Sequence, residues 1–393
     1  MHSRGTAESA RYWYYLALLW LVGIDLRLTL LAVPPVLPQI HQDLRLSEAG
    51  VGALTVMPVL LLGIAAIAGS LMIAKIGARR ATIFGLLLVA LAGSARGFGP
   101  SAAMLFGMTF LMGAGIAICQ PAAPTLIGAW FPRQIGFATA VYVNGILVGE
   151  AIPAGLTIPL VMPLVAGSWE ANLAVWSLPV LLTPLLFRLF VPRELPVAHE
   201  DRPEWWPDWR DPMTWRLGIM QGGISVLYFG LNAYIPDFFH AVGRPWMAAP
   251  AIAALNIMQL PGSFAVLFVA QRLAGRREFF IAVLLAAIPG LGFLIFGSDW
   301  LAIAGVSIFG CTSAIGLSMI IALAPMVADQ RNVHRLSAGA FTIGYLGSFA
   351  GTLLGGVLWD ATHVPATAFI PVGVGAALVA LIGGTMRLKP AAT

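Results

Sequence analysis

The sequence has very few charged residues and very few cysteines for its length. Asp, Glu, Lys and Arg make up 10% of 393 residues, while hydrophobic residues make up 59% and the mean hydropathy is +0.88. No ordinary soluble domain of this size has so apolar a composition, so the soluble globular class is excluded. The two cysteines, Cys119 and Cys311, lie inside apolar runs, which argues against a disulfide framework and predicts two small core residues.

Several motifs of pumps and enzymes are also missing. The sequence has no Gly-x4-Gly-Lys-Ser/Thr phosphate loop, which argues against ATP-driven pumping, and no Gly-x-Ser-x-Gly nucleophile elbow. The histidines lie at ends and in loops without metal-binding spacing. The net charge of +5 comes from short basic clusters between apolar runs, which indicate membrane topology rather than nucleic-acid binding. We therefore predict no enzyme, no metal or cofactor, and no nucleic-acid partner.

What remains is a series of apolar segments long enough to cross a bilayer as helices. Strands of a membrane barrel would be shorter and would alternate in hydropathy. The predicted fold class is therefore an all-α polytopic membrane protein with twelve transmembrane helices in two pseudo-symmetric six-helix bundles. The segments span residues 13–38, 50–74, 80–98, 101–130, 136–165, 170–190, 215–239, 247–271, 279–297, 300–327, 336–359 and 364–386.

The distribution of Lys and Arg predicts the orientation of these helices. With the N-terminus placed in the cytoplasm, most of them fall on the inner side, and outside the membrane only Arg45, Arg96 and Arg244 fall on the outer side. We therefore expect a multi-pass protein of a bacterial inner membrane, with both termini in the cytoplasm.

The longest break between apolar segments, residues 191–214, is proline-rich and predicts a cytoplasmic linker. It separates an N-terminal bundle, residues 1–190, from a C-terminal bundle, residues 215–393. Its tryptophans are expected at the lipid headgroups, with partner binding as the alternative. An internal repeat with parallel halves supports this division. One constant offset superposes Pro38 on Pro236, Gly77 on Gly275, Arg79 on Arg277, Arg133 on Arg331 and Gly149 on Gly347.

Small residues recur in the fifth and eleventh segments at a spacing that favours close packing of membrane helices. They are Gly145, Gly149, Gly347, Gly351 and Gly355.

Short motifs along the chain resemble the major facilitator superfamily. The stretch Ser70-Leu-Met-Ile-Ala74-Lys75-Ile-Gly77-Ala-Arg79-Arg80 resembles the loop motif after the family's second helix, with Ser70 and Ala74 where the family has Gly and Asp. The resemblance implies a secondary transporter in which segments 1, 4, 7 and 10 line a central cavity and segment 5 packs beside segment 1. Further motifs resemble the cyanate permease and nitroimidazole transporter branch: Asp25-Leu-Arg27, Phe131-Pro132-Arg133, Arg335-Leu-Ser337 and Gly344-Tyr345.

Two charges near the middle of the first segment are the first functional candidates, because a charge retained at this depth usually faces a partner or a water-filled path. Helix rise places Arg27 and Glu150 at similar depth, near the midplane. Asp25, two residues from Arg27 on one helix, points to a different side. A lone guanidinium suits one small monovalent anion. The structural alternative is an ion pair that only locks two helices together.

Polar residues at comparable depth are candidate solute ligands, although membrane helices also use such residues to hydrogen-bond one another. Burial favours the neutral form of a carboxylic acid, so proton uptake with the solute would couple transport to protons. Glu150 is preferred over Asp25 for this role. The candidate substrate-binding residues are Arg27, Gln120, Tyr228, Asn232, Gln259 and Tyr345.

The sequence thus predicts a monomeric secondary transporter in a lipid bilayer. Its predicted solute is a cyanate-like anion or a small carboxylate or nitro anion, moved by alternating access around a midplane site, with a proton as the candidate coupling ion. Export of a drug-like or nitroaromatic compound is the alternative within transport. A membrane-embedded receptor or enzyme is the alternative outside it. The direction of flux stays open.

Overall fold

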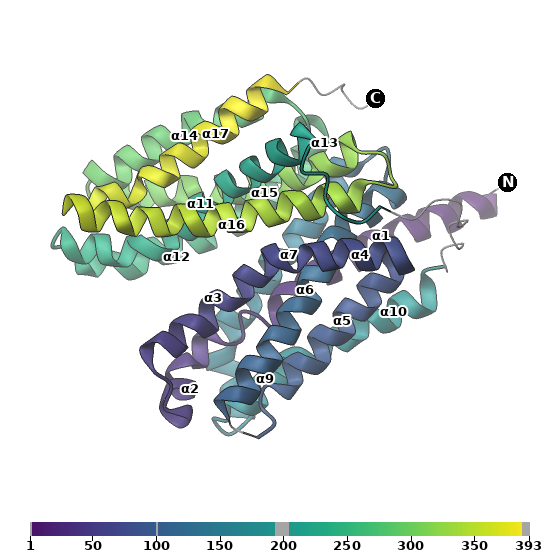
Figure 1. The fold of residues 1–393 in the computed structure, drawn as a ribbon, viewed down its shortest axis with the longest axis horizontal. Helices are drawn as coiled ribbons and strands as arrows, with labels where there is room; N and C mark the ends of the chain where they lie inside the picture. The colour runs from purple at the N-terminus through teal and green to yellow at the C-terminus, as the bar shows by residue number, and fades with distance from the viewer. Residues whose placement is uncertain (1, 100, 193–203, 387–393) are drawn as a thin grey trace. The chain divides into compact units, whose positions relative to one another are not determined.

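The described residues are almost entirely helical and form no strand, so the predicted all-α class is confirmed (Figure 1). The computed structural model describes residues 2–99, 101–192 and 204–386. Backbone contacts divide the chain into two compact units. Unit 1 comprises Met1–Pro132, Val141–Pro207 and Gln330–Ala338, and unit 2 comprises Arg133–Ala140, Asp208–Asp329 and Gly339–Thr393.

A glycine separates two helices in the first half of the chain. Gly77 has a φ of 83°, a conformation that favours glycine, and it separates the fourth helix from the fifth. The elements are α1 (His2–Leu28), η1 (Pro34–Val36), α2 (Leu37–Leu44), α3 (Glu48–Ile64), α4 (Ala66–Ile76), α5 (Ala78–Ala95), α6 (Ala102–Trp130), α7 (Ile135–Leu156), η2 (Thr157–Val161), α8 (Met162–Leu164), α9 (Trp169–Ser177), η3 (Leu178–Leu181) and α10 (Leu182–Phe190).

The second half of the chain repeats this pattern of long helices with short 3-10 or broken segments between them. Its elements are α11 (Pro212–Ala241), η4 (Pro245–Met247), α12 (Ala248–Ile257), α13 (Gln259–Leu273), α14 (Arg277–Phe296), α15 (Asp299–Val327), α16 (Val333–Thr362), η5 (Pro365–Phe369) and α17 (Ile370–Thr385). Two helices change unit along their length. The first turns of α7 belong to unit 2, and the first turns of α16 belong to unit 1.

Many of these helices can cross a membrane. Among the described residues, nine helices are long and apolar enough, or ten if the pair Met57–Ile64 and Ala66–Ile76, bent by 44°, is one span. Helices α1 and α11 lie where the first and seventh segments were predicted, but they are not among these nine.

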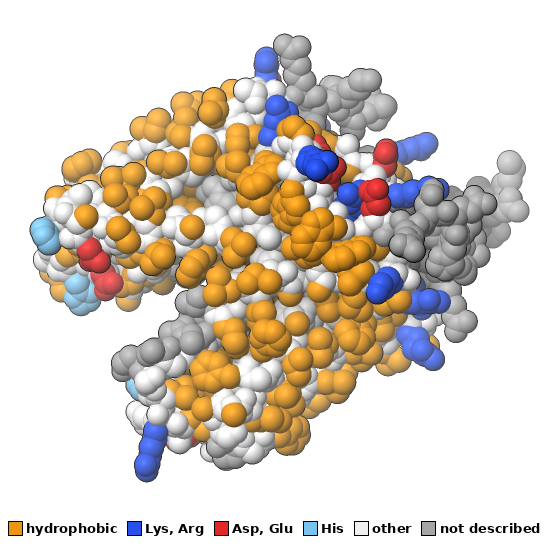
Figure 2. Space-filling view, viewed as in Figure 1, with side chains coloured by type: hydrophobic (Ala, Val, Ile, Leu, Met, Phe, Trp, Pro, Cys, Tyr) orange, Lys and Arg blue, Asp and Glu red, His pale blue; other side chains and the backbone are white. Residues whose placement is uncertain are grey.

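The flanks of the helices carry the apolar surface that a lipid-facing protein requires (Figure 2). Phe268, Phe296 and Trp300 are 85%, 86% and 84% exposed. Exposed apolar area costs about 25 cal/mol per Å² in water, and hydrocarbon removes this cost. The exposed side chains therefore face lipid, and the chain is a multi-pass membrane protein.

Glycines bring α1 and α7 into backbone contact within unit 1. A Cβ at Gly145 would lie 2.2 Å from Trp20 O, and one at Gly149 would lie 2.4 Å from Ile24 O. Because both contacts advance along the two helices together, α1 and α7 run in the same direction. The predicted close packing is confirmed for these two glycines. It is also confirmed for Gly351 and Gly355, where a Cβ would lie 2.8 Å from Val226 Cγ2 and 2.6 Å from Ala368 O. It was wrong for Gly347, where a Cβ would meet no atom of the described chain within 4 Å.

Two buried arginines of unit 1 cap helix ends, a role that charge counting did not predict. Arg96, expected as a charge in an outer loop, is 1% exposed and donates to Thr29 O at 2.8 Å, just beyond the end of α1. Arg79, in the motif after α4, donates to Val191 O at 2.9 Å and to Phe187 O at 3.2 Å. Both guanidinium groups satisfy carbonyls that a helix end leaves unpaired.

Replacing Arg79 with alanine is expected to lower the free energy of unfolding by about 1.5–3 kcal/mol, because the carbonyls at the end of α10 lose a charged donor. Thermal unfolding in detergent measures the effect as a lower Tm. The neighbouring Arg80 is exposed, so Arg80→Ala provides the control and should leave the Tm unchanged. Equal shifts in the two variants would contradict the capping role.

Candidate functional site

The structure brings Arg27 of α1 and Glu150 of α7 together in unit 1. Arg27 Nε lies 3.3 Å from Glu150 Oε1, and the two side chains are 11% and 18% exposed. The glycine contacts explain this position, because Ile24 lies against Gly149, Glu150 directly follows Gly149, and Arg27 lies about one turn after Ile24. A neutral pair of opposite charges is the arrangement that makes a guanidinium tolerable within a membrane.

Asp25 lies apart from this pair, as expected from its place on α1. It is 4% exposed and accepts a hydrogen bond from the Thr183 hydroxyl of α10. Among the residues that the structure describes, no hydrogen-bond partner reaches its Oδ2. Asp25 thus contacts α10 within unit 1, while Arg27 contacts α7.

A second polar cluster lies in unit 2 and contains two of the predicted solute ligands. The Tyr228 hydroxyl donates to Asn256 Oδ1 at 2.8 Å, and Asn256 Nδ2 donates to Asn232 Oδ1 at 2.9 Å. Asn232 Nδ2 in turn donates to the backbone carbonyl of Tyr228 at 3.0 Å. Tyr228 and Asn232 are one turn apart on α11, so Asn256 of α12 fixes the orientation of both side chains. The sequence alone gave no signal that Asn256 would join them.

The other three predicted ligands are buried at separate places. Gln120 lies in α6, is 5% exposed and has a polar or charged partner. Gln259 begins α13 and is 6% exposed. Tyr345 lies in α16, is 5% exposed and stacks on Phe341 with ring centroids 6.1 Å apart. The roles of all six predicted ligands stay predictions.

The described residues contain no group of three or more His, Cys, Asp or Glu side chains that could hold a metal ion. The chemistry available to the arrangement is ion pairing, hydrogen bonding and proton exchange. A partly buried guanidinium can exchange its carboxylate partner for another anion with little change in local charge. This is the chemistry of solute binding.

Comparison with known proteins identifies the family. The model of the Major Facilitator Superfamily matches residues 19–352, which is most of the chain. The chain belongs to the Major Facilitator Superfamily. Like other members of this superfamily, it is a transporter of small solutes and not an enzyme.

Two transporters of Escherichia coli (strain K12) are similar to this superfamily member over most of their length. The cyanate transport protein CynX is 26% identical over 325 residues, which cover 82% of this chain and 83% of CynX. The 2-nitroimidazole transporter is 26% identical over 376 residues, which cover 92% of each chain. The resemblance to the cyanate and nitroimidazole branch of the superfamily is thereby confirmed.

The solved structure of the superfamily transporter FucP in its outward conformation shares the fold. Its TM-score is 0.75 at 16% identity, with 94% of this chain and 98% of FucP covered. At this identity the likeness shows the fold alone.

Proposed function

We propose that this transporter moves a small monovalent anion, cyanate-like or a small carboxylate or nitro anion, together with a proton by alternating access. The observation that carries the proposal is the Arg27–Glu150 ion pair within the membrane-spanning part of unit 1. Its guanidinium is a fixed positive group with planar donors, which suits a small anion. Gln120, Tyr228, Asn232, Gln259 and Tyr345 are the proposed neutral ligands.

Charge balance at the pair suggests how the proton takes part. An ionised Glu150 occupies the guanidinium and competes with an incoming anion. When Glu150 takes up a proton, the Arg27 guanidinium can pair with the anion in its place, and the site again holds one positive and one negative charge. An anion and a proton would thus enter together with no net charge movement. Asp25 is the alternative proton carrier.

The relatives support the solute class. One is a cyanate transport protein, whose solute is a small anion, and its sequence matches this chain over most of both lengths. The 2-nitroimidazole transporter favours a second candidate, movement of nitroaromatic compounds. We further propose a monomer in a bacterial inner membrane, with cytoplasmic termini and with bundles 1–190 and 215–393 joined by the linker.

Reconstituted vesicles test the anion and proton proposal directly. An inward proton gradient should drive accumulation of labelled cyanate, whereas a membrane potential alone should not, because the proposed step moves no net charge. Glu150→Gln keeps the side-chain size but binds no proton, so its uptake should lose the response to the gradient. Arg27→Ala should abolish cyanate uptake.

Glu170→Gln is the matched control, because Glu170 lies in α9 and accepts a hydrogen bond from Ser168 at 2.7 Å, outside the ion pair. Its uptake should follow the gradient as in the wild type. Gradient-driven uptake that survives in Glu150→Gln would remove the proposed coupling. Uptake of 2-nitroimidazole that ignores Arg27→Ala would favour the nitroaromatic candidate.

A further inference from the structure

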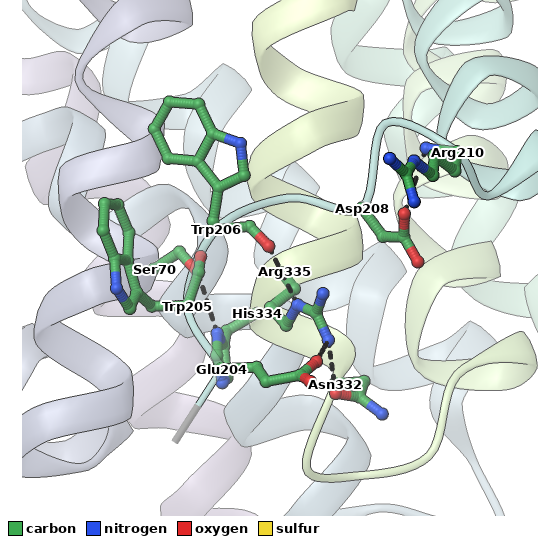
Figure 3. A network of polar contacts seen from close by, with 9 residues as sticks. All are labelled: Ser70, Glu204, Trp205, Trp206, Asp208, Arg210, Asn332, His334 and Arg335. Atoms are coloured by element: carbon green, nitrogen blue, oxygen red, sulfur yellow. Dashed lines mark hydrogen bonds and ion pairs between the residues drawn. The ribbon is translucent and has the colours of Figure 1, made fainter. Parts of the chain in front are cut away.

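Two buried oxygens near the end of α1 lack the hydrogen-bond partners that buried polar atoms generally have. Ser70 of α4 shows the usual case (Figure 3): its buried hydroxyl donates to the carbonyl oxygen of Trp205 in the linker at 2.6 Å and accepts from Nδ1 of His334 at 2.9 Å. Asp25 and Thr29 are 4% and 0% exposed. In the described part of the chain, no hydrogen-bond partner reaches Asp25 Oδ2 or Thr29 Oγ1.

These two side chains lie on the same side of the first membrane segment. Asp25 and Thr29 are four residues apart, a spacing that brings Cβ atoms on a helix within about 5–6 Å. Leu31 N still bonds to Arg27 O at 3.0 Å, so the helical turn continues across Thr29. A threonine hydroxyl within reach of the carboxylate would donate to Oδ2, and this bond is not formed. The two oxygens are therefore neighbours that do not touch, and a group bridging them would satisfy both.

Other helices of unit 1 enclose the two oxygens. Thr183 of α10 is 1% exposed, and its hydroxyl donates to the Asp25 carboxylate. On α5, a Cβ at Gly93 would lie 3.5 Å from Thr29 Cγ2. The region between α1, α5 and α10 thus gathers one carboxylate and two hydroxyl groups away from lipid. It is separate from the Arg27–Glu150 pair, which α1 forms with α7.

The Asp25 carboxylate also lacks a positive partner. No Lys, Arg or His side chain of the described ranges pairs with it, and Arg27 pairs with Glu150 instead. A buried charge is costly unless it is paired or binds a metal ion. A proton would neutralise Asp25 but would leave Thr29 Oγ1 without a partner, and a water molecule would bridge the oxygens but leave the charge. A cation between them meets both requirements.

The ligands and the local charge favour sodium among the cations. Carboxylate and hydroxyl oxygens suit hard ions rather than transition metals, and one carboxylate balances one positive charge. Arg96 bonds to Thr29 O at 2.8 Å, and its positive charge disfavours a divalent ion nearby. The predicted absence of a metal site rested on histidine spacing, which does not reveal a site built from oxygen atoms alone.

The break in the first membrane segment favours the same ion. The segment was predicted to run from residue 13 to residue 38, but α1 ends at Leu28 and the next helical element, η1, begins at Pro34. The C-terminal end of a helix carries a partial negative charge, and such ends of broken membrane helices coordinate sodium ions or protons in transporters. Asp25 and Thr29 lie at this end.

We propose that one sodium ion binds within unit 1 between the Asp25 carboxylate and the hydroxyl oxygens of Thr29 and Thr183. The Thr183 hydroxyl donates its proton to Asp25 and still has lone pairs for the ion. The ion neutralises Asp25 and holds the broken end of α1 against α10. Asp25 then stays ionised, which leaves proton uptake to Glu150. The sodium site itself depends on neither the proposed solute nor the proposed proton coupling.

Thermal unfolding of the full-length protein in detergent tests this site, in chloride salts of sodium, potassium or choline at one pH and one ionic strength. Sodium should raise the Tm by about 2–6 °C and saturate, because the ion binds only the folded state, whereas potassium and choline should not. Asp25→Asn keeps the side-chain size without the charge and should abolish the sodium response. Thr29→Val removes one ligand and should shift the response to about 3- to 10-fold higher sodium.

Glu150→Gln is the matched control, because it also neutralises a buried carboxylate of unit 1 that lies against α1. It should keep the sodium response. A Tm rise that is equal in all three salts, or one that survives in Asp25→Asn, would overturn the site.

Binding of radioactive sodium to the purified protein provides a measurement that does not depend on thermal stability. The wild type should bind about one ion per molecule, and Asp25→Asn should bind none. Should Asp25→Asn fail to fold, Thr29→Val decides, since an unchanged sodium affinity in that variant would overturn the site as well. Absence of sodium binding in a protein that still takes up cyanate with protons would refute the sodium site and leave the proposed function standing.

Discussion

Glu150→Ala is expected to lower the free energy of unfolding by about 3–5 kcal/mol, because it removes the carboxylate that pairs with the buried Arg27 guanidinium. Arg27→Met combined with Glu150→Leu should regain most of this loss, since replacing both members of a buried pair by apolar residues is often nearly neutral. Both variants should lose cyanate uptake. Thermal or denaturant unfolding in detergent and uptake in vesicles provide the two measurements.

This pair of variants separates the two interpretations of Arg27 and Glu150. An ion pair that only locks α1 to α7 predicts that the double variant regains both stability and uptake. A solute-binding pair predicts that stability returns while uptake does not. The more open Arg244–Asp299 pair, with side chains 21% and 48% exposed, is the control. Arg244→Ala there should cost less than Glu150→Ala because solvent screens the charges.

Gly149→Ala is expected to have the second large effect, because its Cβ would lie 2.4 Å from Ile24 O in a backbone that cannot rotate away. Separating α1 from α7 should cost about 1–3 kcal/mol and shift Glu150 relative to Arg27. Uptake should therefore fall together with the Tm. Unfolding in detergent measures the Tm, and uptake is measured in vesicles.

Gly347→Ala is the control for Gly149→Ala, since the two glycines are equivalent in the internal repeat. A Cβ at Gly347 meets no described atom within 4 Å, so alanine should be neutral or should stabilise the helix by about 0.5–1 kcal/mol. Similar losses of Tm and uptake in both variants would show that alanine disturbs α7 and α16 for a reason other than the contact with α1.

The family resemblance implied that the fifth segment packs beside the first, and helix rise placed Arg27 and Glu150 at similar depth, so the pairing of α1 with α7 was expected. The burial of Arg96 was not predicted, because counting Lys and Arg on each side of the membrane gives an orientation and does not tell whether an arginine near the end of a segment is buried. The contacts of Ser70 with the linker were equally hidden, since an irregular segment such as Glu204–Trp206 has no periodicity that predicts its neighbours.

The second polar cluster shows the same limit. Tyr228 and Asn232 were both predicted as ligands because they are polar residues at comparable depth in one segment. Their contact with Asn256 depends on how α12 crosses α11, and that crossing is set by the packing of apolar side chains around it. A single sequence does not specify which residues of two such helices lie opposite each other.

The glycine contacts between α1 and α7 also decide how the ion pair can open. With backbones touching at Gly145 and Gly149, the two helices have little room to slide, so the backbones at Arg27 and Glu150 keep their spacing. The two charges then separate only when a side chain rotates. The arrival of a proton or of a competing anion would favour that rotation.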